Sequence, residues 1–121
     1  MLNVVIQDVG EVTVLHLRGR IVRGVPIETL RKVVSAQGSA RAVILDLARV
    51  DLIDAGGLGA LLEMRMRAHS KGIEFKLMNV TPRVKDVLAI TRLDSVFEFA
   101  SREDLQAIAG RDQESEMMVV N

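Results

Sequence analysis

Two runs at the start of the chain, residues 2–9 and 12–18, are rich in β-branched and apolar residues, a pattern typical of strands. Gly10-Glu11 separates the two runs, and glycine at such a junction predicts a hairpin turn. Side chains of a strand alternate between its two faces. In the second run one face therefore carries Thr13, Leu15 and Leu17, and the other carries Val12, Val14 and His16.

Beyond the hairpin, helical and strand periods alternate. Helices are predicted over residues 26–37, 57–71, 82–88 and 101–109, and strands over 42–47, 73–77 and 96–99. Pro26 and Pro82 suit first helical turns, and Ser101 with Asp104 has the pattern of a capping box. The strand 42–47 is apolar on both faces, as in a parallel strand that helices cover on both sides. We therefore expect an α/β layered domain with a mixed sheet, an N-terminal hairpin and about four helices.

The last residues of the chain differ in character from the rest. Polar residues fill 111–116, and Met-Met-Val-Val follows at 117–120. We expect residues 1–109 to form a single domain, a size at which one core is sufficient. Residues 110–121 are expected to form a mobile C-terminal tail that could dock on a partner.

Composition excludes several classes of function. Hydrophobic residues make up 49% of the chain but aromatic ones only 2%, so the core consists of aliphatic side chains. The 16 acidic and 16 basic residues balance, which argues against nucleic-acid binding. The lack of cysteine excludes disulfides and thiolate chemistry. No basic leader and no apolar run of about 20 residues is visible, so we expect a cytoplasmic protein without a membrane span.

The segment 51–62, Asp-Leu-Ile-Asp-Ala-Gly-Gly-Leu-Gly-Ala-Leu-Leu, joins a predicted strand to a predicted helix. In α/β domains such turns present backbone N–H groups and short side chains to a partner or an anion. Asp54 suits the N-cap of the helix. Gly56 and Gly57 either allow the helix start to pack closely on the sheet or form an anion cradle. The charge of Asp54 at the same positive helix end argues against the cradle.

Residues 43–59, Val-Ile-Leu-Asp-Leu-Ala-Arg-Val-Asp-Leu-Ile-Asp-Ala-Gly-Gly-Leu-Gly, resemble the signature of the STAS domain, the fold of bacterial anti-sigma factor antagonists. Further matches follow the family order, namely Gly19-Arg-Ile, Leu30-Arg, Thr81-Pro-Arg-Val through Leu88, and Thr91-Arg-Leu-Asp-Ser-Val-Phe. The resemblance covers roughly residues 3–109. It implies a regulatory module that binds another protein and uses no cofactor.

The chain departs from the family pattern at Ala55. In the family the turn reads Asp-Ser-Ser/Thr-Gly-Leu/Ile-Gly, and the residue after the Asp is phosphorylated. Phosphorylation would add about −1.5 to −2 charge and end partner binding. Alanine has no hydroxyl, and Gly56 supplies no neighbouring one. A permanently active antagonist, a scaffold that needs no switch, and an engineered serine-to-alanine substitution all remain open.

A second departure lies in the first loop, where the family commonly carries an Asp at the position of Val22. Arg23-Gly24 makes this loop positive, which argues against the usual kinase-like anti-sigma partner and favours a different partner surface. The resemblance implies a partner-binding surface that includes the exposed side of helix 57–71. Its residues are Val22, Arg23, Gly24, Asp54, Ala55, Gly56, Gly57, Leu58 and Gly59.

Three functions are compatible with these observations. The first is a non-enzymatic antagonist that sequesters an anti-sigma factor, kinase-type or otherwise, and cannot be switched at Ala55. The second is a structural STAS subunit of a larger signalling or lipid-transport assembly, with other STAS-interacting proteins as partners and a homo-oligomer as one possible form. The third is a sensor of a small ligand or nucleotide at the glycine turn.

Metal-dependent and histidine-dependent chemistry is not predicted. His16 and His69 lie far apart without ligand spacing, and no nucleophile is expected near His16. Asp46, Asp51 and Asp54 cluster in the sequence, but Asp46 belongs to a predicted strand and Asp51 to a predicted turn. We therefore expect no metal ion and no enzyme activity.

Overall fold

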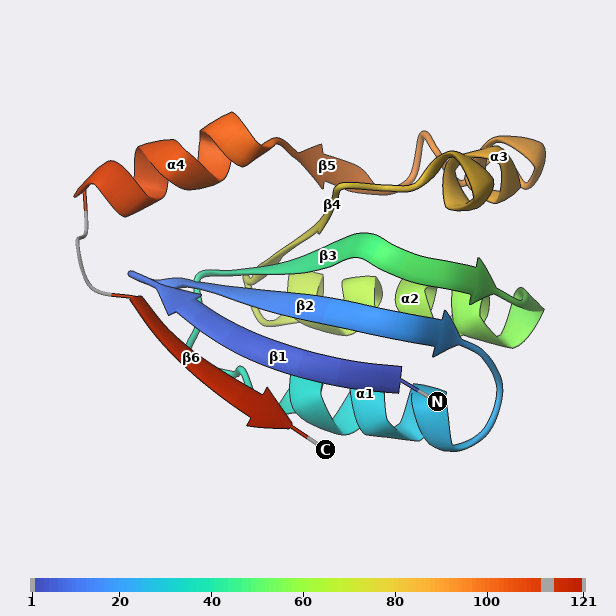
Figure 1. Cartoon of the computed structure of the whole chain (residues 1–121), viewed down its shortest axis with the longest axis horizontal. Coiled ribbons are helices and arrows are strands. Elements are labelled where there is room, and N and C mark those ends of the chain that lie inside the picture. The colour runs from blue at the N-terminus through green and yellow to red at the C-terminus, as the bar shows by residue number, and fades with distance from the viewer. Residues whose placement is uncertain (1, 112–114, 121) are drawn as a thin grey trace.

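The computed structural model describes residues 2–111 and 115–120 of the chain, and side chains over residues 2–107. Strands and helices alternate after an N-terminal hairpin (Figure 1). In chain order the elements are β1 (Leu2–Val9), β2 (Val12–Ile21), α1 (Val25–Ser35), β3 (Ala42–Ile53), α2 (Ala55–Ser70), β4 (Glu74–Met78), α3 (Pro82–Ile90), β5 (Glu98–Ala100), α4 (Arg102–Arg111) and β6 (Ser115–Val120).

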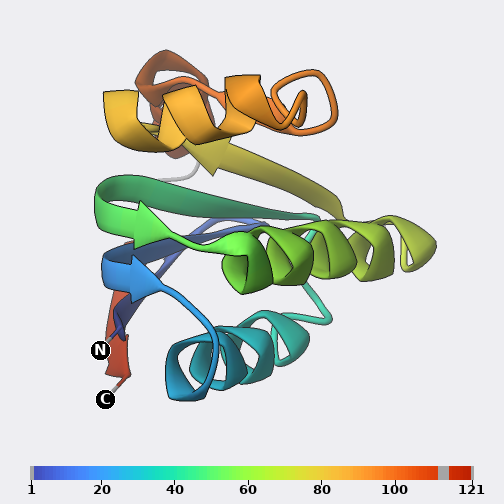
Figure 2. The same cartoon turned by 90° about the vertical axis from the view of Figure 1, so that its right-hand side faces the viewer.

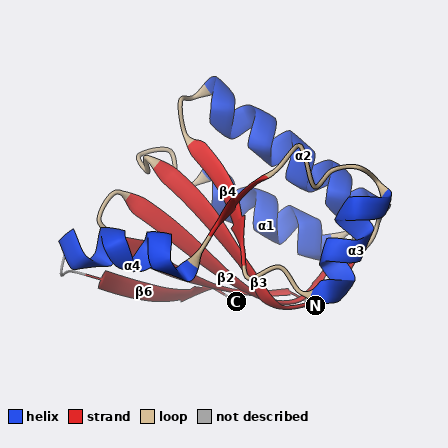
Figure 3. Cartoon of the chain, turned by 90° about the horizontal axis from the view of Figure 1, so that it is seen from above, coloured by secondary structure: helices blue, strands red, loops and turns tan. Residues whose placement is uncertain are grey.

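The described strands form one six-stranded mixed sheet in the order β5-β4-β3-β2-β1-β6. β2, β3, β4 and β5 are parallel to one another, whereas β1 is antiparallel to both β2 and β6. Helices α1 and α2 lie on one face of the sheet and α4 lies on the other (Figure 3). The predicted fold class, an α/β layered domain with an N-terminal hairpin and four helices, is confirmed.

Two apolar clusters on the two faces of the sheet hold the layers together. The larger one joins Leu15 and Leu17 of β2 to the buried faces of α1, α2 and α3. The smaller one joins Val12 and Val14 of β2 to neighbouring strands and to Leu105 of α4. The alternation predicted for the second strand is therefore correct, and each face of β2 is buried against a different helical layer.

Local signals in the sequence locate several element ends correctly. Thr81 caps α3 with Pro82 in its first turn. The Ser101 N–H donates to the Asp104 carboxylate while the Asp104 N–H donates to the Ser101 hydroxyl, which confirms the capping box. Gly72 follows α2 with a φ of 72°, a left-handed conformation that favours glycine after a helix.

Two strands run further than the sequence pattern predicted. β2 continues to Ile21 and β3 to Ile53, so Asp51 lies in a strand and its assignment to a turn is wrong. The register between the two strands shifts along this extension. From the pair His16–Asp46 to the pair Arg18–Arg49, β2 advances by two residues and β3 by three, so β3 contains one extra residue. A bulge of this kind changes which side chains face each side of the sheet.

The C-terminal segment also differs from the expected mobile tail. α4 ends at Arg111, and residues 115–120 form β6, which pairs antiparallel with β1 from Val4↔Val120 to Val9↔Ser115. A strand that adds to an open sheet edge satisfies the backbone donors and acceptors of that edge. Residues 112–114 and 121 of the expected tail lie outside the described residues.

Candidate functional site

The loop after β2 and the turn after β3 emerge together at one end of the sheet. Ile21 and Ile53 are register partners on these parallel strands, so the segments 22–24 and 54–59 start next to each other. Figure 2 faces this end, where β2 leads into α1 and β3 leads into α2. The parallel sheet thus brings together the two segments that the sequence singled out.

Asp54 binds both segments through its side chain. One carboxylate oxygen accepts a hydrogen bond from the Gly57 N–H at 2.7 Å, which is the N-cap bond of α2. The other accepts a hydrogen bond from the Arg23 N–H at 3.2 Å, across to the first loop. The predicted N-cap is therefore confirmed, and the same side chain also fastens the first loop to the turn.

The two hydrogen bonds also affect the acid–base behaviour of this carboxyl. The bond from the Gly57 N–H, followed by that from the Arg23 N–H, lowers the pKa of Asp54. The Arg23 charge acts in the same direction. A carboxylate that caps a helix N-terminus is stabilised in its ionised form, so Asp54 presents a fixed negative charge at neutral pH.

Gly57 is required by the close approach of α2 to the sheet. A Cβ added to it would overlap the carbonyl oxygen of Ile21 and would lie 3.0 Å from Cγ2 of Ile53. Of the two roles predicted for the glycines, Gly57 therefore has the first, since it allows the start of α2 to pack closely on the sheet. Gly56 is less constrained, since a Cβ there would lie 3.3 Å from Oδ1 of Asp54 and 3.5 Å from Cβ of Arg23.

The predicted partner-binding residues differ in accessibility. Arg23, Gly24, Ala55 and Gly59 are exposed, whereas Gly57 and Leu58 are buried at the start of α2. Val22, Asp54 and Gly56 are partly exposed. The accessible part of the candidate surface is therefore the first loop together with Ala55 and Gly59, and Leu58 belongs to the apolar core.

The outer side of α2 and the start of α1 extend this surface with apolar groups. Met64 is buried, whereas Met66, on a different side of the same helix, is 71% exposed. Val25, directly after the first loop, is 78% exposed. Glu63 and Arg67 form an i,i+4 ion pair at 3.3 Å on the same helix.

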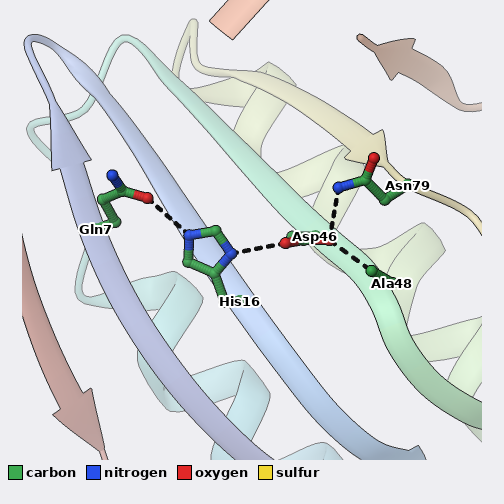
Figure 4. Close-up of polar contacts among 5 residues, drawn as sticks. All are labelled: Gln7, His16, Asp46, Ala48 and Asn79. Carbon is green, nitrogen blue, oxygen red and sulfur yellow. Dashed lines mark hydrogen bonds and ion pairs between the residues drawn. The ribbon is translucent and has the colours of Figure 1, made fainter. Parts of the chain in front are cut away.

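The sequence analysis did not predict a polar network on the sheet face that carries α4 (Figure 4). His16 of the middle strand β2 contacts both neighbouring strands, with its Nδ1 2.7 Å from Asp46 Oδ2 on β3 and its Nε2 2.7 Å from Gln7 Oε1 on β1. Asp46 also accepts hydrogen bonds from the Ala48 N–H and the Asn79 side chain, each at 3.1 Å. The two ring nitrogens of His16 thus connect Gln7 of β1 with Asp46 of β3.

The environment of Asp46 keeps it ionised. Burial raises its pKa, but hydrogen bonds from His16, the Ala48 N–H and Asn79 outweigh this effect, so the pKa of Asp46 is lowered. The parallel register His16↔Asp46 places the two side chains together. Once β2 is known to pair with β3, the sequence agrees with this contact, because each residue comes four positions after the apolar start of its strand, at Val12 and at Ala42.

The acidic residues that cluster in the sequence do not converge in space. Asp46 is engaged with His16, Asp51 lies along β3, and Asp54 caps α2. Over residues 2–111 and 115–120, no group of three or more His, Cys, Asp or Glu side chains is placed to hold a metal ion. In the same part of the chain, no helix is long and apolar enough to cross a membrane.

The mixed sheet with helices on both faces and the capped turn after β3 define a small layered α/β domain. The profile of the STAS domain family matches residues 3–105. The chain therefore belongs to the STAS domain family.

A curated relative is similar in sequence to part of the chain. The chain is 30% identical over 60 residues to a STAS-domain containing protein of Pseudomonas aeruginosa (strain UCBPP-PA14), a match that covers 50% of this chain and 59% of that protein. The chain thus spans less than two thirds of this curated relative.

Two solved structures have the same fold. An anti-sigma factor antagonist from Mycobacterium paratuberculosis superposes with a TM-score of 0.73 at 22% identity, covering 93% of this chain and 96% of that one. An anti-sigma-factor antagonist (STAS) domain protein from Planctomyces limnophilus gives a TM-score of 0.68 at 25% identity, covering 86% and 97%.

Proposed function

We propose that this chain is a non-enzymatic antagonist that binds an anti-sigma factor and thereby frees a sigma factor. The binding surface consists of the loop 22–24, the turn 54–59 and the exposed side of α2. The observation that carries this proposal is the double hydrogen bond of Asp54, which fixes the loop and the turn as one surface. The fold that the chain shares with antagonist proteins supports it.

The proposed antagonist has no phosphorylation switch in this turn. Ala55 is exposed as the first residue of α2, at the position that carries the phosphorylated hydroxyl in switchable members. Ser35 ends α1 and Ser70 ends α2, so Ser70 lies about 22 Å along the helix axis from Ala55 at about 1.5 Å per residue. A small neutral residue at 55 corresponds to the unphosphorylated, binding-competent form.

The charge of the first loop bears on the partner. Arg23 lies beside Gly56 and its charge acts on the Asp54 carboxylate, so the surface presents a positive and a negative group side by side. Complementary charges mainly set specificity and encounter rate. The proposed partner therefore presents an acidic group opposite Arg23, in contrast to partners that recognise an acidic first loop.

A comparison of three forms of the protein tests the proposal. The wild-type chain, an Ala55→Glu variant and an Ala89→Glu control are used to capture partners from extracts of the native organism. The control adds the same charge at another exposed helical alanine, on α3. An anti-sigma factor recovered by the wild type and the control, but lost with Ala55→Glu, supports the proposal, since negative charge at residue 55 blocks the surface.

The same experiment separates the structural alternative. Recovery of other STAS proteins or of transporter subunits, unchanged by Ala55→Glu, would contradict the antagonist role and favour a subunit of a larger assembly. The apolar segment 117–120 belongs to the part of the chain that was expected to form a docking tail. Its backbone pairs with β1 within the sheet, so it does not support the structural alternative.

A further inference from the structure

The sheet face that carries α4 is not fully covered by that helix. α4 packs on Val12, Val14 and their neighbours through Leu105. Further along the same strands lies a hollow of about 580 Å³, whose polar lining includes Asn3, Gln7, His16, Arg18, Asp46 and Arg49. Its volume falls within the range of small-molecule sites. It shares no residue with the loop 22–24 or the turn 54–59.

Two arginines lie side by side in this hollow. Arg18 of β2 and Arg49 of β3 are register partners on neighbouring parallel strands, and both are exposed. The bulge in β3 produces this arrangement. Leu47 and Val50 both point into the core with α1 and α2, so the extra residue between them turns Arg49 to the opposite face.

Among the side chains described over residues 2–107, neither arginine has an acidic partner. Each ion pair found over residues 2–107 involves other basic residues, and Arg18 and Arg49 take part in none of them. Like charges directly opposite each other in a sheet destabilise it. A ligand that carries negative charge would relieve this repulsion.

The acidic residue in the hollow does not neutralise the arginines. Asp46 is occupied by hydrogen bonds from His16, the Ala48 N–H and Asn79, as Figure 4 shows. The His16–Asp46 pair and the two guanidinium groups together leave the hollow with net positive charge. Asn3, exposed on β1, adds an amide to the lining.

We propose that this hollow binds a small oxyanion ligand, with a phosphate or carboxylate group held between Arg18 and Arg49. Guanidinium groups recognise both oxyanions through paired N–H donors, and two of them can flank one anionic group. His16, held between Gln7 and Asp46, lines the hollow together with Arg18. This ligand site lies apart from the proposed partner surface and does not depend on the antagonist role.

An NMR titration of the full chain tests the proposal. Inorganic phosphate, acetate and chloride are added separately at constant ionic strength, and backbone amide shifts are followed. We expect phosphate or acetate to give saturable shifts confined to residues 3–7, 16–18 and 46–49, and chloride to give none. The stronger of the first two ligands identifies the preferred oxyanion.

Variants then assign the binding to the arginines. Each of the variants Arg18→Gln and Arg49→Gln lacks one charged hydrogen-bond donor to the anion. We expect each substitution to lower the affinity for the anion by about tenfold. Arg83→Gln removes the same charge from an exposed site on α3 and should leave the affinity within about twofold. Amide spectra of the variants confirm that the fold is unchanged.

A second readout uses stability. Phosphate should raise the melting temperature of the wild type, since a ligand that binds only the folded state stabilises it. The Arg18→Gln/Arg49→Gln double variant should melt higher than the wild type without phosphate and should gain little from it. Shifts that do not saturate, or that Arg83→Gln weakens as much as Arg18→Gln, would overturn the proposal. The proposal would also be overturned if both arginine variants bound the anion as tightly as the wild type.

Discussion

At the scale of single residues, the Asp54 carboxylate connects two segments that are 31 residues apart in the sequence. It caps α2 through Gly57 and holds the first loop through Arg23. Gly24, which follows Arg23, adopts a φ of 102°, a conformation that favours glycine and lets the loop turn into α1. The shape of the candidate surface therefore depends on a carboxylate and a glycine from different segments.

Replacement of Asp54 by alanine should loosen both segments. The Gly57 and Arg23 N–H groups lose their acceptor, so we expect a lower urea midpoint and faster amide exchange at both positions. Asp51→Ala, which removes an exposed carboxylate from β3, serves as the control and should leave both amides protected. Unchanged exchange of the Arg23 amide in Asp54→Ala would show that the carboxylate does not hold the loop.

Acid should destabilise the protein in a defined window. Hydrogen bonding lowers the folded-state pKa of Asp46, Asp54 and Asp104 below the ordinary value of 3.8. The stabilisation from these carboxylates is complete above that value and is lost as pH falls through the lower folded-state pKa. Urea unfolding at a series of pH values should show this decline, and Asp54→Asn should make it shallower. If the free energy of unfolding stayed constant as the pH is lowered beyond about 4, these assignments would be wrong.

At the scale of elements, the approach of α2 to β2 leaves no room for a side chain at Gly57. Gly57→Ala should therefore cost about 1–3 kcal/mol through overpacking against Ile21 and Ile53. Gly59 lies on the same helix with nothing within 4 Å of an added Cβ. Gly59→Ala should stabilise the protein by about 0.5–1 kcal/mol. Chemical denaturation measures both changes, and equal effects at the two glycines would refute the packing argument.

The elements also explain which features could be read from the sequence. Helix starts at Asp54, Thr81 and Ser101 were predictable because capping depends on residues only a few positions apart. The apolar alternation of β2 was predictable for the same reason. The turn after β3 was recognised from its own residues, and its neighbour, the first loop, from the family pattern.

Features that depend on strand register were not predictable in this way. The contact between His16 and Asp46 requires the pairing of β2 with β3, and the exposure of Arg49 requires the bulge after Asp46. Neither is encoded within a local window. The pairing of residues 115–120 with β1 is likewise non-local, because it brings together the two ends of the described chain.

At the scale of the whole molecule, the domain presents two separate surfaces on one sheet. The loop 22–24 and the turn 54–59 lie where β2 and β3 lead into α1 and α2, and the arginine hollow lies on the face that carries α4. Substitutions at one surface should leave the other unaffected, since distant sites without shared partners are usually independent. Arg49→Gln should therefore not alter partner binding if the two surfaces act separately.

The central claim is that the chain frees a sigma factor by occupying its anti-sigma factor at the surface around Ala55. The most direct test adds the purified chain to a complex of a sigma factor with the anti-sigma factor that it captures, and measures the released sigma factor. We expect release by the wild type and by Ala89→Glu, and at least about tenfold weaker release by Ala55→Glu, equivalent to about 1.4 kcal/mol. No release by the wild type, or equal release by Ala55→Glu, would contradict the account.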